Sequence, residues 1–148
     1  MALLDLTIRS SIEELQTLAD RVDAVAETKC WPQKTLFALQ VSLDEWISNV
    51  IKYSYQNQPG RPIRVTIEQD AQAAMSALGG RGDLVVCIED EGSAFDPSDS
   101  EVPTSLEETL SGQREGGMGL FVMRHLLKDI AYHQRKGRNI VTLRIGLC

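Results

Sequence analysis

Two residues near the middle of the chain have the types and the spacing for chemistry on a phosphate or a metal ion. Glu45 and Asn49 lie four residues apart in a segment with a helical apolar stripe, so both side chains project from one helix face. Asn49 can offer an amide oxygen to a hard cation such as Mg²⁺, and Glu45 can position or deprotonate a nucleophile. A solvated polar helix face explains the same two residues without any function.

A second candidate follows the apolar run from 84 to 88. Asp90 comes at the end of this predicted buried strand, where its carboxylate can accept a hydrogen bond from an exocyclic amine such as that of adenine. Gly92 would allow a flat ligand to approach the backbone closely. The alternative is an ordinary Asp-Glu-Gly turn after a strand.

The third candidate is the glycine-rich run Gly116-Gly-Met-Gly119, which precedes an apolar segment with helical spacing. Backbone N–H groups at the start of a helix can bind phosphate, helped by the positive end of the helix dipole. A glycine-rich helix entry without phosphate is the alternative. The sequence has no G-x-x-x-x-G-K-[ST] run, so it contains no P-loop.

The elements that must position these residues follow from the spacing of apolar residues, which differs between strands and helices. Ser10 or Ser11 can begin the first helix with a capping box. Pro32 suits the first turn of the second helix, which carries Glu45 and Asn49 and should run to about Tyr55. We expect strands at 3–9, 63–68, 84–88, 131–135 and 140–145, and helices at 12–26, 32–55 and 119–130.

Two further segments have turn or loop character. Residues 71–83 read as a widened hairpin loop, and the polar stretch from 91 to 115 contains a predicted lid at about 96–115. Helices in one set and mostly antiparallel strands in another predict an α+β fold, a two-layer α/β sandwich with a mixed, mostly antiparallel sheet and helices on one face. The length of 148 residues suits a single domain over 1–148.

The composition and the sequence pattern argue against several classes of partner, metal site and location. The net charge of −6 disfavours binding to nucleic acid and to anionic membranes. The three cysteines show no CxxC or Cys/His pattern of the kind that a structural zinc site needs. The N-terminus lacks the form of a secretory signal and no segment approaches the length of a membrane span, so we expect a cytoplasmic protein.

Taken in chain order, the three candidates resemble the N, G1 and G2 boxes of the histidine-kinase-like (GHKL) ATPase superfamily. The matching residues are Glu45-x-x-x-Asn49, Asp90-x-Gly92-x-x-Phe95-Asp96-Pro97 and Gly116-Gly-Met-Gly119-Leu, and within the superfamily the bacterial anti-sigma-factor serine/threonine kinases match best. The resemblance implies a Bergerat-type site for ATP and Mg²⁺. It places Asp90 on the adenine amine, Gly92 under the base, Asn49 on Mg²⁺, the Gly116–Gly119 backbone on the phosphates, and Phe95, Gly117, Met118 and Leu120 in the same nucleotide site.

The resemblance also implies an activity and partners. Glu45 would be the catalytic base that takes the proton of a serine or threonine on an antagonist protein, and Arg114, the only basic residue of the acidic lid, would contact the γ-phosphate. Such proteins typically form homodimers and hold a sigma factor until the antagonist displaces it. An ATP-gated binding module without kinase activity, and an interaction protein with a vestigial pocket, are the alternatives. Tyr53 stands where many relatives have a histidine.

Overall fold

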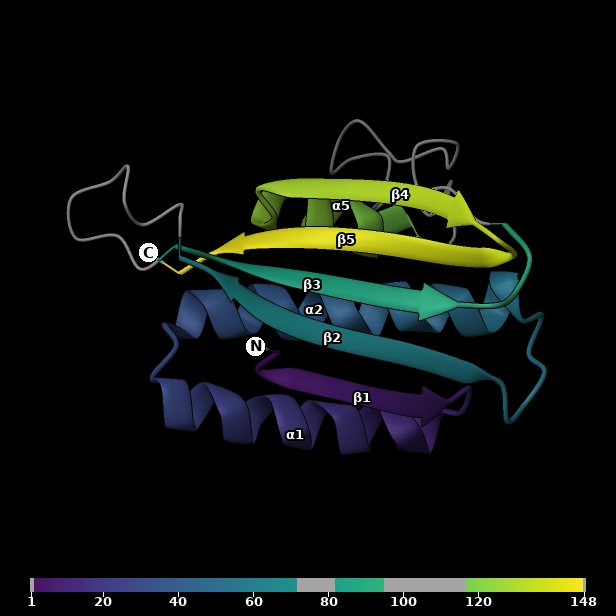
Figure 1. Cartoon of the computed structure of the whole chain (residues 1–148), viewed down its shortest axis with the longest axis horizontal. Helices are drawn as coiled ribbons and strands as arrows, with labels where there is room; N and C mark the ends of the chain where they lie inside the picture. Colours follow the sequence, from purple (N-terminus) through teal and green to yellow (C-terminus); the bar gives the residue numbers. More distant parts are fainter. Residues whose placement is uncertain (1, 72–81, 95–116, 148) are drawn as a thin grey trace.

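The sheet at the centre of the fold has the strand order β1-β2-β3-β5-β4, and every neighbouring pair is antiparallel. The computed structural model describes residues 2–71, 82–94 and 117–147 (Figure 1). The predicted strands are confirmed apart from their ends, and the described sheet is antiparallel rather than mixed. Its strands are β1 (Leu4–Arg9), β2 (Pro62–Asp70), β3 (Asp83–Asp90), β4 (Asp129–Arg135) and β5 (Arg138–Gly146).

The described helices gather on one face of this sheet, and no described element covers the other, open face (Figure 1). This arrangement confirms the predicted two-layer α+β sandwich. No helix in the described ranges is both long and apolar enough to cross a membrane. The helical elements are α1 (Ile12–Lys29), α2 (Gln33–Asn49), the π-helix η1 (Val50–Ser54) and α5 (Gly117–Leu126).

Several helix ends depart from the sequence predictions. Ser11 is the N-cap of α1 but makes no side-chain cap hydrogen bond, so the predicted capping box is wrong. The Ser10 hydroxyl instead donates to the carbonyl oxygen of Gln58 at 2.7 Å, a tertiary contact that competes with capping. Pro32 is the N-cap of α2 rather than part of its first turn. Ile130, predicted as helical, belongs to β4 and pairs with Leu143.

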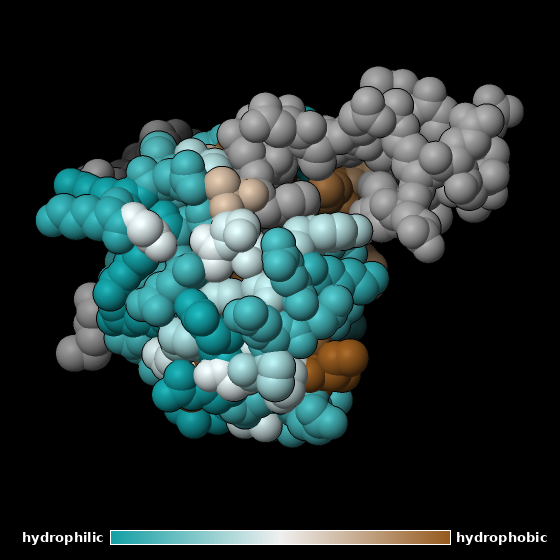
Figure 2. Space-filling view, turned by 90° about the vertical axis from the view of Figure 1, so that its right-hand side faces the viewer, coloured by the Kyte–Doolittle hydropathy of each residue, from teal (hydrophilic) through white to brown (hydrophobic). Residues whose placement is uncertain are grey.

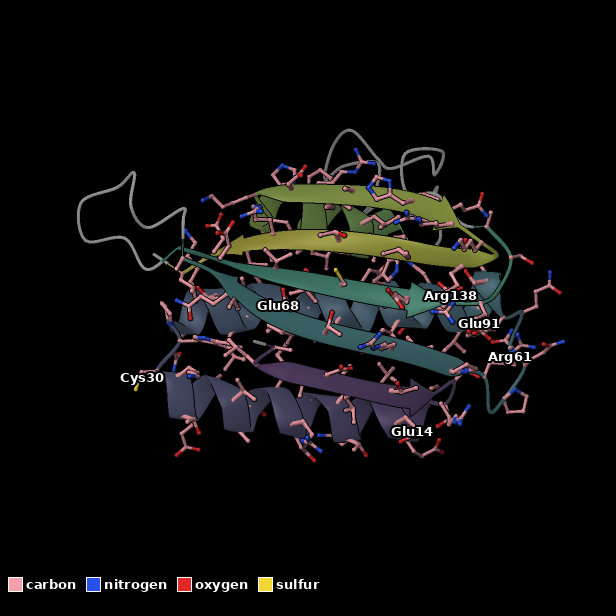
Figure 3. The ribbon with its side chains drawn as sticks, in the orientation of Figure 1. Glu14, Cys30, Arg61, Glu68, Glu91 and Arg138 are labelled. Atoms are coloured by element: carbon pink, nitrogen blue, oxygen red, sulfur yellow. The ribbon has the colours of Figure 1, made fainter. Side chains whose placement is uncertain are left out.

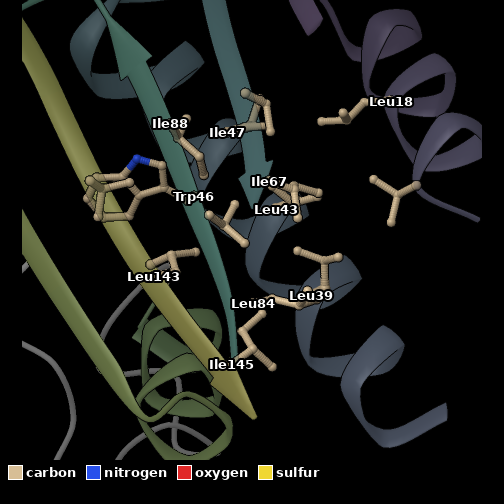
Figure 4. Packing of buried hydrophobic residues seen from close by; sticks show 14 of the residues in the cluster. Leu18, Leu39, Leu43, Trp46, Ile47, Ile67, Leu84, Ile88, Leu143 and Ile145 are labelled. Carbon is tan, nitrogen blue, oxygen red and sulfur yellow. The ribbon is translucent and has the colours of Figure 1, made fainter. Parts of the chain in front are cut away.

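The core lies between the helices and the inward face of the sheet. Alternate residues of the three central strands are almost fully buried, and they pack against the apolar stripe of α2 (Figure 4). Burying each such side chain contributes about 1.5–3 kcal/mol, so this interface fixes the position of α2 over the sheet. The packed residues include Ile63, Val65 and Ile67 of β2, Leu84, Val86 and Ile88 of β3, Val141, Leu143 and Ile145 of β5, and Leu39, Leu43, Trp46 and Ile47 of α2.

A two-residue turn joins β4 to β5 and sets their register. Lys136 and Gly137 both have positive φ, at 54° and 77°, which is the geometry of a type I′ hairpin. In the pairing of β4 with β5, Arg135 lies opposite Arg138. In the pairing of β3 with β5, Asn139 lies opposite Asp90. The hairpin therefore brings a residue from near the C-terminus to the end of β3.

The opposite end of β3 carries a cluster of paired charges. Asp83 is buried and accepts from Lys128 Nζ at 2.8 Å and from Arg144 Nη1 at 3.1 Å. Arg144 also pairs with Asp70 at 2.9 Å. These contacts tie the facing ends of β2, β3 and β5 together with the segment before β4.

Candidate functional site

The three segments identified from the sequence meet at one end of the molecule. The C-terminal end of α2, the end of β3 and the start of α5 all lie on the right-hand side of Figure 1. Figure 2 looks onto this end, and its described surface is predominantly hydrophilic. Three of the predicted site residues, Phe95, Arg114 and Gly116, and the predicted lid lie outside the described residues.

Glu45 and Asn49 lie next to each other on α2, as their spacing predicts. Asn49 Nδ2 donates to Glu45 Oε1 at 3.2 Å, and the Asn49 side chain is buried. Burial raises the pKa of Glu45 above its ordinary value; the Asn49 hydrogen bond opposes this shift, the charge of Asp44 adds to it and that of Lys52 opposes it. A carboxylate with a raised pKa is better matched to accepting a proton near neutral pH than an ordinary surface glutamate.

The start of α5 packs directly against Glu45. A Cβ atom placed on Gly119 would overlap the Glu45 carboxyl group, so a larger residue here would require the Glu45 side chain to move away from the start of α5. Gly117, Met118 and Gly119 of the predicted glycine turn belong to α5, which begins at Gly117. N–H groups in the first turn of a helix have no partner within it and can bind an anion. Leu120 is buried in the core, so its side chain serves packing.

Asp90 is buried at the end of β3 with only 2% of its surface exposed. Its Oδ1 accepts from the Gly92 N–H at 2.9 Å and from Asn139 Nδ2 at 2.8 Å. Burial raises the pKa of Asp90 above its ordinary value, although these two hydrogen bonds act in the opposite direction. Across the described ranges, Oδ2 accepts no hydrogen bond, so the described part of the chain leaves its acceptor capacity unused.

Gly92 is required for a contact with the π-helix. A Cβ on Gly92 would lie 2.6 Å from the carbonyl carbon and 2.8 Å from Cβ of Ser54. This close approach lets the Ser93 N–H donate to the Ser54 carbonyl oxygen at 2.8 Å. Gly92 thus joins the end of β3 to the end of the α2–η1 segment, whereas the sequence prediction assigned its missing side chain to contact with a ligand.

Tyr55 links the end of β3 to the start of β2 through its hydroxyl group. It is buried, its hydroxyl donates to the Pro62 carbonyl oxygen, and it accepts from the Glu91 N–H at 2.8 Å. The guanidinium of Arg61 stacks over the ring, 5.1 Å from its centroid. Arg61, Glu91 and Arg138 lie near one another at this end of the sheet (Figure 3).

Asn139 lies beside Asp90 in the candidate site, and the sequence interpretation missed it. Its position next to Lys136-Gly-Arg predicted a turn residue, yet only 3% of its surface is exposed. The alternation that turns Val141 and Leu143 inward also turns Asn139 inward, so a polar residue in phase with the buried positions of β5 was the available signal.

The residues present suit a nucleotide with Mg²⁺. Asn49 uses its Nδ2 on Glu45, which leaves its amide oxygen for a cation, and amide and carboxylate oxygens are the ligands that Mg²⁺ prefers. In the described ranges, no group of three or more His, Cys, Asp and Glu side chains could hold a metal ion. A magnesium ion here would therefore depend on Asn49, water and phosphate oxygens, as is usual for this ion.

Comparison with known proteins places this chain in a family. Residues 8–145 match the histidine kinase-like ATPase domain. The serine/threonine-protein kinase BtrW of Bordetella bronchiseptica is 30% identical over 115 residues, which is 76% of this chain and 72% of BtrW. The serine-protein kinase RsbW of Bacillus pumilus is 20% identical over 138 residues, which is 91% of this chain and 80% of RsbW.

A solved structure extends the likeness to three dimensions. A chain of the SiaB-SiaC complex from Pseudomonas aeruginosa superposes with a TM-score of 0.62 at 13% identity, over 97% of this chain and 89% of that chain, and this likeness supports the fold alone. The domain match covers nearly the whole sequence, and it includes the segments that hold Glu45, Asn49, Asp90, Gly92 and Gly119. The chain belongs to the histidine kinase-like ATPase family.

Proposed function

We propose that this protein is a serine/threonine kinase that transfers the γ-phosphoryl group of ATP to an antagonist protein in a partner-switching pathway. The observation that carries the proposal is the position of Glu45. Its half-buried carboxylate lies between the Asn49 amide and the first turn of α5. A base there would stand beside both the predicted cation ligand and the predicted phosphate site. The kinases BtrW and RsbW, similar over most of the chain, support the same activity.

The chemical step would follow from these positions. The oxygen of a serine or threonine hydroxyl attacks the γ-phosphorus, the bond from that phosphorus to the β–γ bridging oxygen breaks, and the hydroxyl proton passes to Glu45. ADP and a phosphorylated protein are the products. Asn49 would hold Mg²⁺, which offsets negative charge on the phosphates, and positioning would supply much of the rate enhancement.

Substitution of Glu45 by glutamine tests the catalytic role. The E45Q side chain keeps its size and can still accept from Asn49, so we expect ATP affinity to change by less than about threefold, while loss of the base lowers phosphoryl transfer roughly 100-fold or more. The assay supplies ATP, Mg²⁺ and purified candidate antagonists and detects phosphoserine or phosphothreonine. Transfer by E45Q at the rate of the unmodified protein would contradict the assignment.

An ATP-gated binding module is the second candidate, favoured by the composition of the predicted lid. Residues 96–115 contain Asp96, Asp99, Glu101, Glu107, Glu108 and Glu115 but only one basic residue, Arg114, to offset developing charge on the phosphate. In this case ATP would change the affinity for a partner, and E45Q would switch as well as the unmodified protein. Partner binding with and without ATP, measured for both proteins, separates the two functions.

The finer partners are also proposals. A sigma factor held by this protein and released for an antagonist, a homodimeric state and a cytoplasmic location all rest on the family resemblance and on the sequence. A pull-down from native cells with and without ATP would identify the bound proteins. Sedimentation equilibrium tests the dimer, and cell fractionation tests the location.

A further inference from the structure

Both ends of the Asn139 side-chain amide make several polar contacts. Its Nδ2 lies 2.8 Å from Asp90 Oδ1, 3.1 Å from the Gly92 carbonyl oxygen and 3.0 Å from the Ser93 carbonyl oxygen. Its Oδ1 accepts from the Tyr132 hydroxyl at 2.8 Å and from Gln134 Nε2 at 3.3 Å. The amide thus joins the end of β3 to the inward face of β4.

These partners fix the orientation of the amide. Acceptors surround its nitrogen and donors surround its oxygen, so rotation by 180° would set a carbonyl oxygen against three other oxygens. The amide therefore directs an N–H at Asp90. Tyr132, on the neighbouring strand, holds the opposite end of the amide in place.

The same contacts fix the carboxylate of Asp90. The Gly92 N–H and the Asn139 amide both donate to Oδ1, and neither donor carries a charge. With Oδ1 held on two sides, Oδ2 keeps a defined position and remains a hydrogen-bond acceptor. Arg138, the residue before Asn139, approaches Glu89 at 3.9 Å and Glu91 at 4.0 Å, so its charge is shared with those two carboxylates.

We propose that Asn139, supported by Tyr132, is a positioning residue that turns Asp90 Oδ2 toward the ligand and so selects a purine with a 6-amino group. This inference rests on the proposed nucleotide site and deepens it. A cationic residue at position 139 would pair with Asp90 and reduce the attraction that its negative charge exerts on an amine. A neutral amide orients the carboxylate and leaves that charge for the ligand.

The test compares ATP with purine riboside triphosphate, which lacks the 6-amino group, by titration calorimetry with Mg²⁺. Loss of one hydrogen bond to a charged acceptor should make the analogue bind the unmodified protein about tenfold more weakly than ATP. In Asn139→Leu we expect the ratio of the two affinities to fall to within about twofold of one. Tyr132→Phe removes only a hydroxyl, and we expect it to reduce the ratio about threefold.

The matched control is Thr142→Val on the same strand. Alternation turns residue 142 to the opposite face of the sheet, where Thr142 Oγ1 lies 3.6 Å from Cys87 Sγ. It should leave the ratio unchanged. Thermal unfolding checks that each variant is folded, and Tyr132→Phe carries the test if Asn139→Leu does not fold. An unchanged ratio in a folded Asn139 or Tyr132 variant overturns the inference, even if both nucleotides bind more weakly. Failure of the unmodified protein to bind ATP would instead overturn the proposed function itself.

Discussion

Strand β3 buries an aspartate at each of its ends, and the surroundings of the two carboxylates differ. Asp83 is 3% exposed and contacts two cations, Lys128 and Arg144. Asp90 is 2% exposed, and among the described residues it accepts hydrogen bonds only from a neutral amide and a backbone N–H. A buried charge costs free energy unless it is paired, so Asp83 suits a structural role. In the described ranges no cation pairs with Asp90, which fits the role in ligand binding that we propose for this carboxylate.

The pKa directions agree with this difference. Burial raises the pKa of Asp83, but its hydrogen bonds to Lys128 and Arg144 and their charges outweigh burial, and the net pKa lies below the ordinary value. For Asp90, burial dominates and the net pKa lies above the ordinary value. Burial alone therefore does not identify a functional carboxylate. The two carboxylates differ instead in the charge of their partners, which is positive for Asp83 and neutral for Asp90 in the described ranges.

The largest expected effect comes from Asp90→Asn. Because both protein hydrogen bonds end on Oδ1, an asparagine carbonyl can keep them and place its NH₂ where Oδ2 lies. A donor would then face the donor of the adenine amine, and we expect ATP affinity to fall roughly 100-fold. Affinity for a purine with a 6-carbonyl should rise relative to ATP. Calorimetry measures both, and retained ATP affinity in the folded variant would contradict the adenine role of Asp90.

Asp83→Asn should affect stability rather than binding. Removing this charge leaves Lys128 and Arg144 without it, at a cost of about 2 kcal/mol in the free energy of unfolding, because both cations are partly exposed. ATP affinity should change less than twofold, since the site lies at the other end of the sheet. Urea unfolding and calorimetry on one preparation provide the measurements. A large loss of affinity without loss of stability would reverse the roles of the two aspartates.

Tyr55→Phe tests whether the two ends of β3 differ in how the stability lost on substitution depends on salt. Loss of the hydroxyl leaves the Pro62 carbonyl and the Glu91 N–H without this partner, which should lower the free energy of unfolding by about 1 kcal/mol. These are hydrogen bonds between uncharged groups, so the loss should be the same in low and high salt. The loss in Asp83→Asn should shrink as salt screens the ion pairs. Equal salt dependence of both variants would show that the two ends do not differ in this way.

The smallest effect is a difference in pH dependence. Asp83 has a lowered folded-state pKa, so its stabilisation is present above the unfolded pKa near 4 and is lost as the pH falls through the folded value. Asp90 has a raised folded-state pKa, so its ionised form costs stability at neutral pH, and this cost vanishes below about pH 4. The free energy of unfolding in urea is measured from acid to neutral pH. At neutral pH we expect Asp83→Asn to be less stable, and Asp90→Asn more stable, than the unmodified protein. Differences of the same sign would contradict the assigned pKa directions.

The sequence predicted the features that depend on local spacing. Alternation identified the strands, and a separation of four residues placed Glu45 beside Asn49 on α2. The same spacing predicted a regular helix to Tyr55, whereas the chain forms a π-helix over Val50–Ser54. Its wider turn accompanies the Ser93–Ser54 hydrogen bond, a contact between distant parts of the chain that periodicity does not encode.

Asn139 shows the same limit at the site. Its importance follows from the pairing of β3 with β5, which places it opposite Asp90 although the two residues are 49 positions apart in sequence. Ser10 was assigned to a local cap and instead contacts Gln58. In both cases a short polar side chain had a plausible local role, and tertiary structure gave it another partner.

The two-residue turn at Lys136 and Gly137 gives the nucleotide site an unexpected sensitivity to insertions. Side chains alternate between the faces of a strand, so a one-residue slip of β5 would turn Asn139 to the open face and bring a neighbour toward Asp90. The turn is exposed, as are loops that tolerate insertions, yet under the role proposed for Asn139 its length would affect the choice of base. Over evolution, and in attempts to graft a tag or a sensor into this hairpin, the site should accept changes of residue type at the turn far more readily than changes of length.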